Sequence, residues 1–102
     1  DFVEGHNNLG IILQKIGKFR ESETSFRKAI KLKPDFGPAH NNLGNVLYNL
    51  GQLEDAEASY RKAIQLKPDY PEAQNNLAVT VKYRIVGGEK VFRVQEILTP
   101  TR

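Results

Sequence analysis

A run of five residues recurs at a fixed interval in this chain. It reads His-Asn-Asn-Leu-Gly at residues 6–10 and again at 40–44, and a near copy, Gln-Asn-Asn-Leu-Ala, occupies residues 74–78. A second block keeps the same step of 34 positions, with FRKAIKLKPDF at 26–36 and YRKAIQLKPDY at 60–70. Self-similarity with a period of roughly 20 to 50 residues is typical of stacked repeats. The chain is therefore expected to form a solenoid.

Apolar residues within each repeat are spaced three and four positions apart, which predicts paired helices. Gly17 and Gly51 stand where a left-handed residue ends a helix, and Pro34 and Pro68 stop the second helix of each pair. One helix pair cannot bury its apolar face alone, so about three repeats are needed. The expected helices cover about residues 3–15, 19–33, 38–50, 53–67 and 71–84.

The apolar residues of the first two predicted helices are expected to face the core. In the first helix these residues form one stripe along the helix. The residues in question are Val3, Leu9, Ile12, Leu13 and Ile16, followed by Phe19, Phe26, Ala29, Ile30 and Leu32.

The repeated unit resembles the tetratricopeptide repeat (TPR) family. That family's unit is a helix–turn–helix with Leu-Gly near its start, then a small residue, an aromatic residue, an Ala and a closing Pro. The resemblance covers residues 1 to about 84 and implies an all-α, right-handed α-α superhelix. The matching residues are Leu9, Gly10, Ser22, Phe26, Ala29 and Pro34 in one repeat, and Leu43, Gly44, Ala56, Tyr60, Ala63 and Pro68 in the next.

This resemblance predicts one TPR domain over residues 1–102. It would hold two complete repeats, at about 3–36 and 37–70, and a third, divergent repeat or capping helix at about 71–102. The tail departs from the pattern after Arg84, where the expected small residue, aromatic residue and Pro are missing.

Two structures for this tail remain open. Residues 89–98 could form a divergent second helix, or residues 82–86 and 90–94 could pair as a hairpin around Gly87-Gly88, a good two-residue turn. We favour the helix, because the terminal repeat of an array is usually atypical. Its inward residues would then be Val91, Val94, Ile97 and Leu98.

Composition narrows the class of function. Cys is absent, which excludes disulfides and thiolate metal sites, and no apolar run reaches the ~20 residues that span a bilayer. His6 and His40 recur at the repeat period next to Leu and Asn, which favours packed core residues over catalytic or metal-binding ones. We expect a cytoplasmic, non-catalytic protein with no metal, no cofactor and no membrane partner.

The charge distribution argues against nucleic acid, although the net charge is +3 and the pI is near 9.3. Acidic residues stand early in the second helices and basic residues stand late in them. This order complements the helix dipole and places acid–base pairs at helical spacing, as on an ordinary solvated face. We therefore expect no nucleic-acid partner.

Pairs of Asn in the middle of the first helices are the main functional signal. Asn is a mediocre helix former, so the helix gains nothing from it, whereas its amide both donates and accepts hydrogen bonds. By resemblance to the superhelical TPR arrays of O-GlcNAc transferases, Asn8, Asn42 and Asn76 form a ladder that holds peptide backbone in a concave groove. The alternative is that these residues bond between adjacent helices.

Other positions on the first helices should line the same groove. They are mostly neutral, with Tyr48 and Tyr83 as aromatic anchors. The remaining predicted peptide-binding residues are Asn7, Asn41, Asn45, Asn75 and Lys82, and the same groove is expected to be lined by Ile11, Gln14, Lys15, Asn49 and Val79 as well.

This neutral character argues against the dicarboxylate clamp of some TPR co-chaperones. In that clamp, Lys and Asn of the first repeat, Asn of the second, and Lys and Arg of the third hold an acidic C-terminus. A single one of those positions, Asn42, keeps the required residue. The positions here read Asn7, Ile11, Asn42, Glu72 and Asn76.

The predicted function is a non-catalytic interaction module that binds a peptide or protein segment. Two alternatives remain. The chain could be a self-assembly element that forms homo-oligomers through its solenoid ends or tail. It could also be the TPR targeting arm of a larger enzyme such as a glycosyltransferase, because Asp1-Phe2 matches the end of a repeat, Asp35-Phe36.

Overall fold

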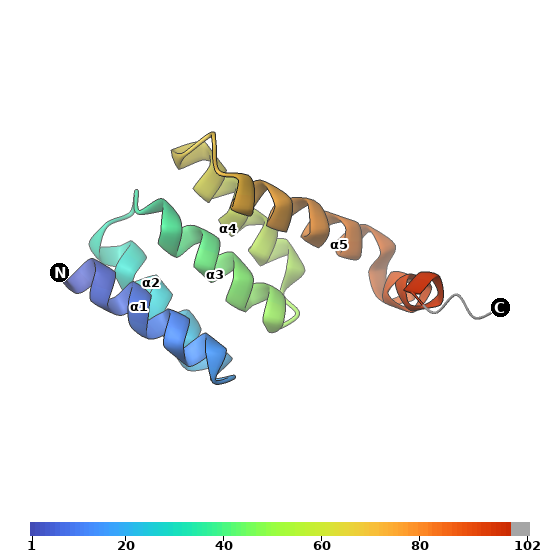
Figure 1. The fold of residues 1–102 in the computed structure, drawn as a ribbon, viewed down its shortest axis with the longest axis horizontal. Coiled ribbons are helices and arrows are strands. Elements are labelled where there is room, and N and C mark those ends of the chain that lie inside the picture. The colour runs from blue at the N-terminus through green and yellow to red at the C-terminus, as the bar shows by residue number, and fades with distance from the viewer. Residues whose placement is uncertain (99–102) are drawn as a thin grey trace.

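The computed structural model describes the backbone of residues 1–98 and the side chains of residues 1–86. This part of the chain forms five α-helices and no strand. The first helices of the repeats, α1, α3 and α5, lie side by side, and α2 and α4 form a second layer behind them (Figure 1). The all-α prediction of two repeats followed by a capping helix is confirmed. The helices are α1 (Phe2–Lys15), α2 (Phe19–Leu32), α3 (Gly37–Asn49), α4 (Leu53–Leu66) and α5 (Pro71–Leu98).

As predicted, α1 and α3 are each followed by a glycine in the left-handed region. Gly17 has φ 84° and Gly51 has φ 81°, a conformation that costs a glycine little. The amide of Lys18 then donates to the carbonyl of Leu13 over 2.9 Å, and an equivalent bond closes α3. These bonds satisfy carbonyl groups that the helix end would otherwise leave without partners. The chain can therefore reverse within three residues and start the second helix of the pair.

A side chain near the start of α3 bonds to the turn that precedes this helix, and its counterpart in α5 does the same. His40 is buried, and its Nε2 lies 2.7 Å from the carbonyl oxygen of Pro34. Gln74, one repeat later, donates its Nε2 to the carbonyl of Pro68 over 2.8 Å. The same contact is made by an imidazole in one repeat and an amide in the next. Its role is thus to fix the turn, which agrees with the prediction of a packed His40.

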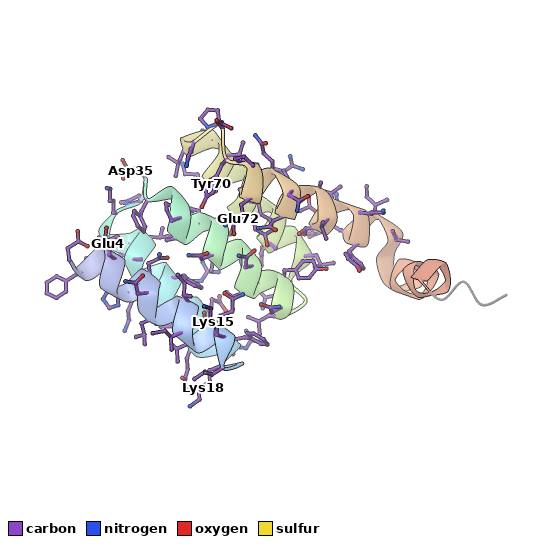
Figure 2. The ribbon with its side chains drawn as sticks, in the orientation of Figure 1. Glu4, Lys15, Lys18, Asp35, Tyr70 and Glu72 are labelled. Carbon is purple, nitrogen blue, oxygen red and sulfur yellow. The ribbon has the colours of Figure 1, made fainter. Side chains whose placement is uncertain are left out.

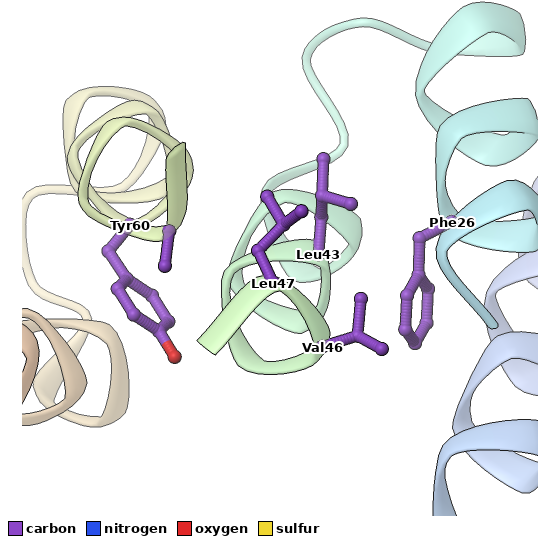
Figure 3. Close-up of a cluster of buried hydrophobic side chains, with 6 residues drawn as sticks. Phe26, Leu43, Val46, Leu47 and Tyr60 are labelled. Atoms are coloured by element: carbon purple, nitrogen blue, oxygen red, sulfur yellow. The ribbon is translucent and has the colours of Figure 1, made fainter. Parts of the chain in front are cut away.

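The core lies on both sides of α3 and depends on one glycine in α1 and one in α3. Phe26 of α2 faces Val46 on one side of α3, and Tyr60 of α4 lies on the other side (Figure 3). A Cβ atom at Gly44 would come within 2.6 Å of the Tyr60 ring, and one at Gly10 within 2.5 Å of the Phe26 ring. The absence of a side chain at these positions lets the buried ring lie directly on the helix backbone.

The expectation that the apolar stripe of α1 faces the core is wrong for three residues. Leu9, Ile12 and Ile16 are 46%, 57% and 62% exposed, whereas Leu43 and Val46, which match the first two in α3, are 4% and 0% exposed. This face of α3 packs on the first repeat. The same face of α1, the first helix of the stack, has no helix against it in the structure, so it stays open.

Leu32 is also exposed, at 54%, against expectation. At about 100° per residue it lies roughly 120° around α2 from Phe26, the residue at the centre of the buried stripe. Its apolar side chain suggests burial, but its place on the helix turns it outward.

The hairpin predicted as one alternative for the tail is wrong. Residues 82–98 continue α5 as helix through Gly87-Gly88, giving one helix of 28 residues in place of two. Glycine lowers helix stability by about 1 kcal/mol but keeps its N–H, so a pair of glycines need not interrupt a helix as Pro does. Figure 1 shows that the last turns of α5 change direction. The inward positions predicted for Val91, Val94, Ile97 and Leu98 lie outside the described side chains.

Candidate functional site

Hydrogen bonds between side-chain amides join the first helices of successive repeats. Nδ2 of Asn42 donates to Oδ1 of Asn7 over 3.0 Å, and Nδ2 of Asn76 donates to Oδ1 of Asn41 over 3.3 Å. Both bonds join residues 35 positions apart, so one contact is repeated at both steps of the stack. Bonding between adjacent helices, the alternative raised by the sequence, therefore occurs at Asn42 and Asn76.

The two residues of each Asn pair differ in exposure. Asn7 and Asn41 are 7% and 1% exposed and accept the bonds just described. A buried amide is costly unless it is hydrogen-bonded, so these acceptors belong to the frame of the stack. Asn8 and Asn75 are exposed, and Asn42 and Asn76 are half-buried. The ladder predicted from the sequence thus has one exposed member, Asn8, and two that also hold the helices together.

A hollow of about 300 Å³ is lined by side chains of α1, α3, α4 and α5. Its lining contains amides, hydroxyls and one valine, and no charged side chain. Charged residues labelled in Figure 2, such as Lys15 and Glu72, belong to helix ends and do not line it. The lining residues are Gln14, Asn45, Tyr48, Asn49, Tyr60, Asn76, Val79 and Thr80.

The floor of this hollow is a hydrogen-bonded pair that differs from its counterpart in the first repeat. The Tyr60 hydroxyl donates to Oδ1 of Asn45 over 2.6 Å, and Nδ2 of Asn76 donates to the same oxygen over 3.2 Å. Burial of the phenol raises the pKa of Tyr60 well above its usual value. One repeat earlier these positions are Phe26 and Ile11, and Ile11 packs against the core cluster that contains Phe26. The second repeat thus replaces an apolar contact with a polar one.

Two aromatic residues predicted as anchors meet at the edge of the hollow. The rings of Tyr48 and Tyr83 have centroids 6.0 Å apart and an interplanar angle of 72°, an edge-on arrangement. Partial burial raises the pKa of Tyr48, and the neighbouring Tyr83 adds to the rise through its charge and a hydrogen bond. Edge-on aromatic pairs are stabilised beyond their buried area, so the two rings form one apolar ledge beside the amides.

An ion pair holds α5 in the position that this ledge requires. Glu57 of α4 is 7% exposed, and its carboxylate accepts a hydrogen bond from Nε of Arg84, the residue after Tyr83. Nη2 of Arg61 approaches the other carboxylate oxygen at 3.6 Å. Because the carboxylate is largely removed from water, loss of Arg84 would leave a buried charge with weaker compensation.

The hollow includes some predicted site residues and leaves out others. Asn45, Tyr48 and Asn76 line it, and Tyr83 packs on Tyr48. Asn42 is half-buried but absent from the lining. The predicted groove residues that lie outside the lining are Asn7, Asn8, Ile11, Lys15, Asn41, Asn42, Asn75, Lys82 and Tyr83.

Two lining residues, Tyr60 and Thr80, are not among the groove residues predicted from the sequence. The sequence pattern predicts Tyr60 as a core residue. The change from Phe26 to Tyr60 together with that from Ile11 to Asn45 could have pointed to a polar contact, because a buried phenol needs an acceptor. Thr80 carried no such signal, since its hydroxyl bonds the carbonyl of Asn76 within its own helix over 2.8 Å.

Neither a metal site nor a membrane span is found in the described part of the chain. No three His, Asp or Glu side chains there are grouped so that they could hold a metal ion. The helices of this part, including the long α5, are too short or too polar to cross a bilayer.

Family models decide what kind of repeat this is. A model described as "Tetratricopeptide repeat" matches residues 3–36, a second model with the same description matches 25–58, and a "TPR repeat" model matches 44–82. The chain belongs to the tetratricopeptide repeat family. With two helix pairs and a capping helix, it is a TPR protein-interaction module.

Solved structures agree with this TPR fold. The first TPR of Spaghetti (RPAP3), solved with the HSP90 peptide SRMEEVD, is 25% identical and has a TM-score of 0.73 over 74% of this chain. The crystal structure of MamA is 23% identical and has a TM-score of 0.79 over 94% of this chain. The match covers 60% of the first structure and 56% of the second. A search among proteins of curated function gives no match.

Proposed function

We propose that this TPR module binds an extended peptide segment in the hollow between α1, α3 and α5. The observation that carries the proposal is the lining: neutral amides and hydroxyls beside an aromatic ledge, with no charged side chain. In a concave site, a small number of polar groups usually orients the ligand, and aromatic side chains supply apolar contact. The best-matched ligand is a peptide whose backbone meets the amides and whose apolar side chain rests on Tyr48 and Tyr83.

The amide hydrogen bonds between helices support peptide binding in addition to holding the repeats together. Nδ2 of Asn42 donates one bond to a neighbouring helix and Nδ2 of Asn76 donates two, so Asn42 keeps a second N–H, and each amide also has an oxygen with two lone pairs. A side chain already held by one bond loses little conformational freedom when a ligand binds. The Asn ladder would therefore act through the groups of Asn42 and Asn76 that the stacking bonds do not use.

The expected ligand differs from the one bound by Spaghetti (RPAP3). That protein was solved with an HSP90 peptide, SRMEEVD, in which three of the last four residues are acidic. Recognition of such an end requires cations, and the hollow here has none among its lining residues. A neutral segment recognised through its backbone fits this lining better.

The test compares variants on an array of immobilised 15-mer peptides of random sequence, followed by titration of the best binders. Tyr48→Ala combined with Asn76→Ala should weaken binding by about tenfold or more, since it removes an apolar ledge and an amide worth roughly 1–2 kcal/mol together. Asn75→Ala is the matched control, because Asn75 is exposed and outside the lining. Equal binding by the double variant and the control would refute the groove.

A second candidate, self-assembly, is favoured by one observation, the open apolar face of α1. Phe2, Leu9, Ile12 and Ile16 are 81%, 46%, 57% and 62% exposed and lie on one stripe. The equivalent face of α3 packs against a repeat, so a second copy of the chain could cover it. Sedimentation velocity at several concentrations tests this. A rise in mass with concentration that Ile12→Lys abolishes would support it, and a monomer at every concentration would exclude it.

A further inference from the structure

A second hollow lies on the opposite side of α3. It measures about 460 Å³ and is formed by side chains of α2, α3 and α4. Its α3 residues, His40 and Leu43, are about 140° and 160° around the helix from Asn45, which lines the first hollow. The two hollows therefore open on different faces and share no lining residue.

The second hollow has an apolar floor and a cationic rim. Ile30 and Leu43 form the floor. Arg27 and Lys31 stand one turn apart on α2, and Lys62 stands opposite them on α4. No acidic side chain is among the lining residues. A ligand in this hollow would meet positive charge on both walls.

Two of the three rim cations have no ion pair with the described side chains. Arg27 bonds Glu23 on its own helix over 2.9 Å, whereas Lys31 and Lys62 take part in none of the ion pairs. Like charges held around an apolar floor repel one another, and a ligand with opposite charge relieves that repulsion. The rim is complementary to an acidic ligand.

We propose that this hollow binds an acidic peptide segment in which one aliphatic side chain is flanked by Asp or Glu. The aliphatic side chain would pack on Ile30 and Leu43, and the flanking carboxylates would pair with Lys31 and Lys62. Burial of the apolar group excludes water around the ion pairs, which strengthens them.

The floor favours a peptide over a nucleic acid. Non-specific single-strand binding relies on aromatic side chains on which bases stack. The lining contains no Phe, Tyr or Trp, and its imidazole, His40, is buried and bonded to the carbonyl of Pro34. Phosphates could meet the rim, but bases would find no stacking surface.

The repeat provides a matched control for the test. Lys62 of α4 occupies the position that Lys28 occupies in α2, and Lys28 does not line the hollow. Lys28→Glu and Lys62→Glu therefore change the net charge equally, at equivalent helix positions. They differ in whether the altered side chain borders the hollow.

The experiment titrates the full chain with a fluorescent nine-residue peptide, one Leu within Asp and Glu, and follows anisotropy. We expect Lys62→Glu to weaken binding at least tenfold, Lys28→Glu to change it less than threefold, and an Asn/Gln version of the peptide to bind at least tenfold more weakly. Tyr48→Ala should leave this binding unchanged, which separates it from peptide binding in the first hollow. Circular dichroism confirms that each variant is folded.

Three results would overturn the proposal. Equal losses in the Lys28 and Lys62 variants would show attraction by net charge alone. Equal binding of the acidic and neutral peptides would show a purely apolar site. Tighter binding of a single-stranded oligonucleotide than of the acidic peptide, lost in Lys62→Glu but not in Lys28→Glu, would assign the rim to phosphates.

Discussion

Helices α1 and α3 share the sequence His-Asn-Asn-Leu-Gly but differ in what that sequence does. In α3 the leucine, Leu43, is 4% exposed, whereas in α1 the equivalent Leu9 is 46% exposed. The glycine of each copy meets a ring in the same way, Phe26 for Gly10 and Tyr60 for Gly44. The contact within a repeat is thus present in both helices, whereas of the two leucines only Leu43 is buried in the core cluster that contains Phe26 of the preceding repeat. In a repeat protein, the role of a residue depends on its neighbours in the stack as much as on its amino-acid type.

The leucines give the largest expected difference between the two helices. Leu43→Ala should lower the free energy of unfolding by about 2–4 kcal/mol, because it opens a cavity in the buried cluster. Leu9→Ala should cost less than about 1 kcal/mol, since much of that side chain is already in water. Urea unfolding followed by circular dichroism measures both. Similar losses would mean that the face of α1 is covered in solution.

Two glycines in α1 should respond in opposite directions to the same substitution. Gly10→Ala should destabilise by about 1–3 kcal/mol, because its Cβ would lie 2.5 Å from the buried Phe26 ring. Gly5→Ala should stabilise by about 0.5–1 kcal/mol, since nothing lies within 4 Å and Ala is the better helix former. Ala39, the equivalent of Gly5 in α3, is buried at 0% exposure, so the fold already accepts Ala there. Thermal unfolding of the two variants should move in opposite directions.

The stability of the fold at alkaline pH should depend on the buried Tyr60, which the second repeat has where the first repeat has Phe26. The pKa of Tyr60 is raised in the folded state by burial, so above pH ~10 the unfolded chain loses a proton that the folded chain keeps. Stability is therefore full below that pH and falls above it, by at most about 1.4 kcal/mol per pH unit for this group. Tyr60→Phe should flatten the decline in urea midpoints above pH ~10. An unchanged slope would show that other groups dominate.

At neutral pH the same substitution should have a smaller effect. Tyr60→Phe removes the hydrogen bond to Asn45 and should cost about 0.5–1.5 kcal/mol. Adding Asn45→Ile recreates the Phe–Ile combination of the first repeat and should recover part of that loss, because no acceptor is then left in the floor. A double-mutant cycle in urea measures the coupling. Strictly additive effects would show that the two side chains do not depend on each other.

The fold was predictable because the determinants of one repeat are local. Gly17, Gly51, Pro34 and the helical spacing of apolar residues set the ends and faces of the helices, and these features are read directly from the sequence. The continuation of α5 through Gly87-Gly88 was not predictable in the same way. A glycine pair suits a turn and is also compatible with a helix, and the choice depends on energy differences of about 1 kcal/mol per residue.

The site was predictable in part. Periodicity placed Asn45, Tyr48 and Asn76 on one side of the first helices, and they do line the hollow. Periodicity could not show that Asn42 and Asn76 also bond the preceding repeat, because that depends on the offset between stacked helices. The contribution of Tyr60 was hidden for the same reason, since its hydroxyl reaches the hollow from the other helix layer.

The amide bonds between repeats imply that the stack can grow by duplication. Each bond joins residues 35 positions apart, so it needs a copy of the unit before it and makes no demand on the length of the whole array. A second copy of residues 37–70 inserted after residue 70 would bring its own donor and its own acceptor. A longer protein could therefore arise in a single genetic step, with every new junction already matched to the old ones.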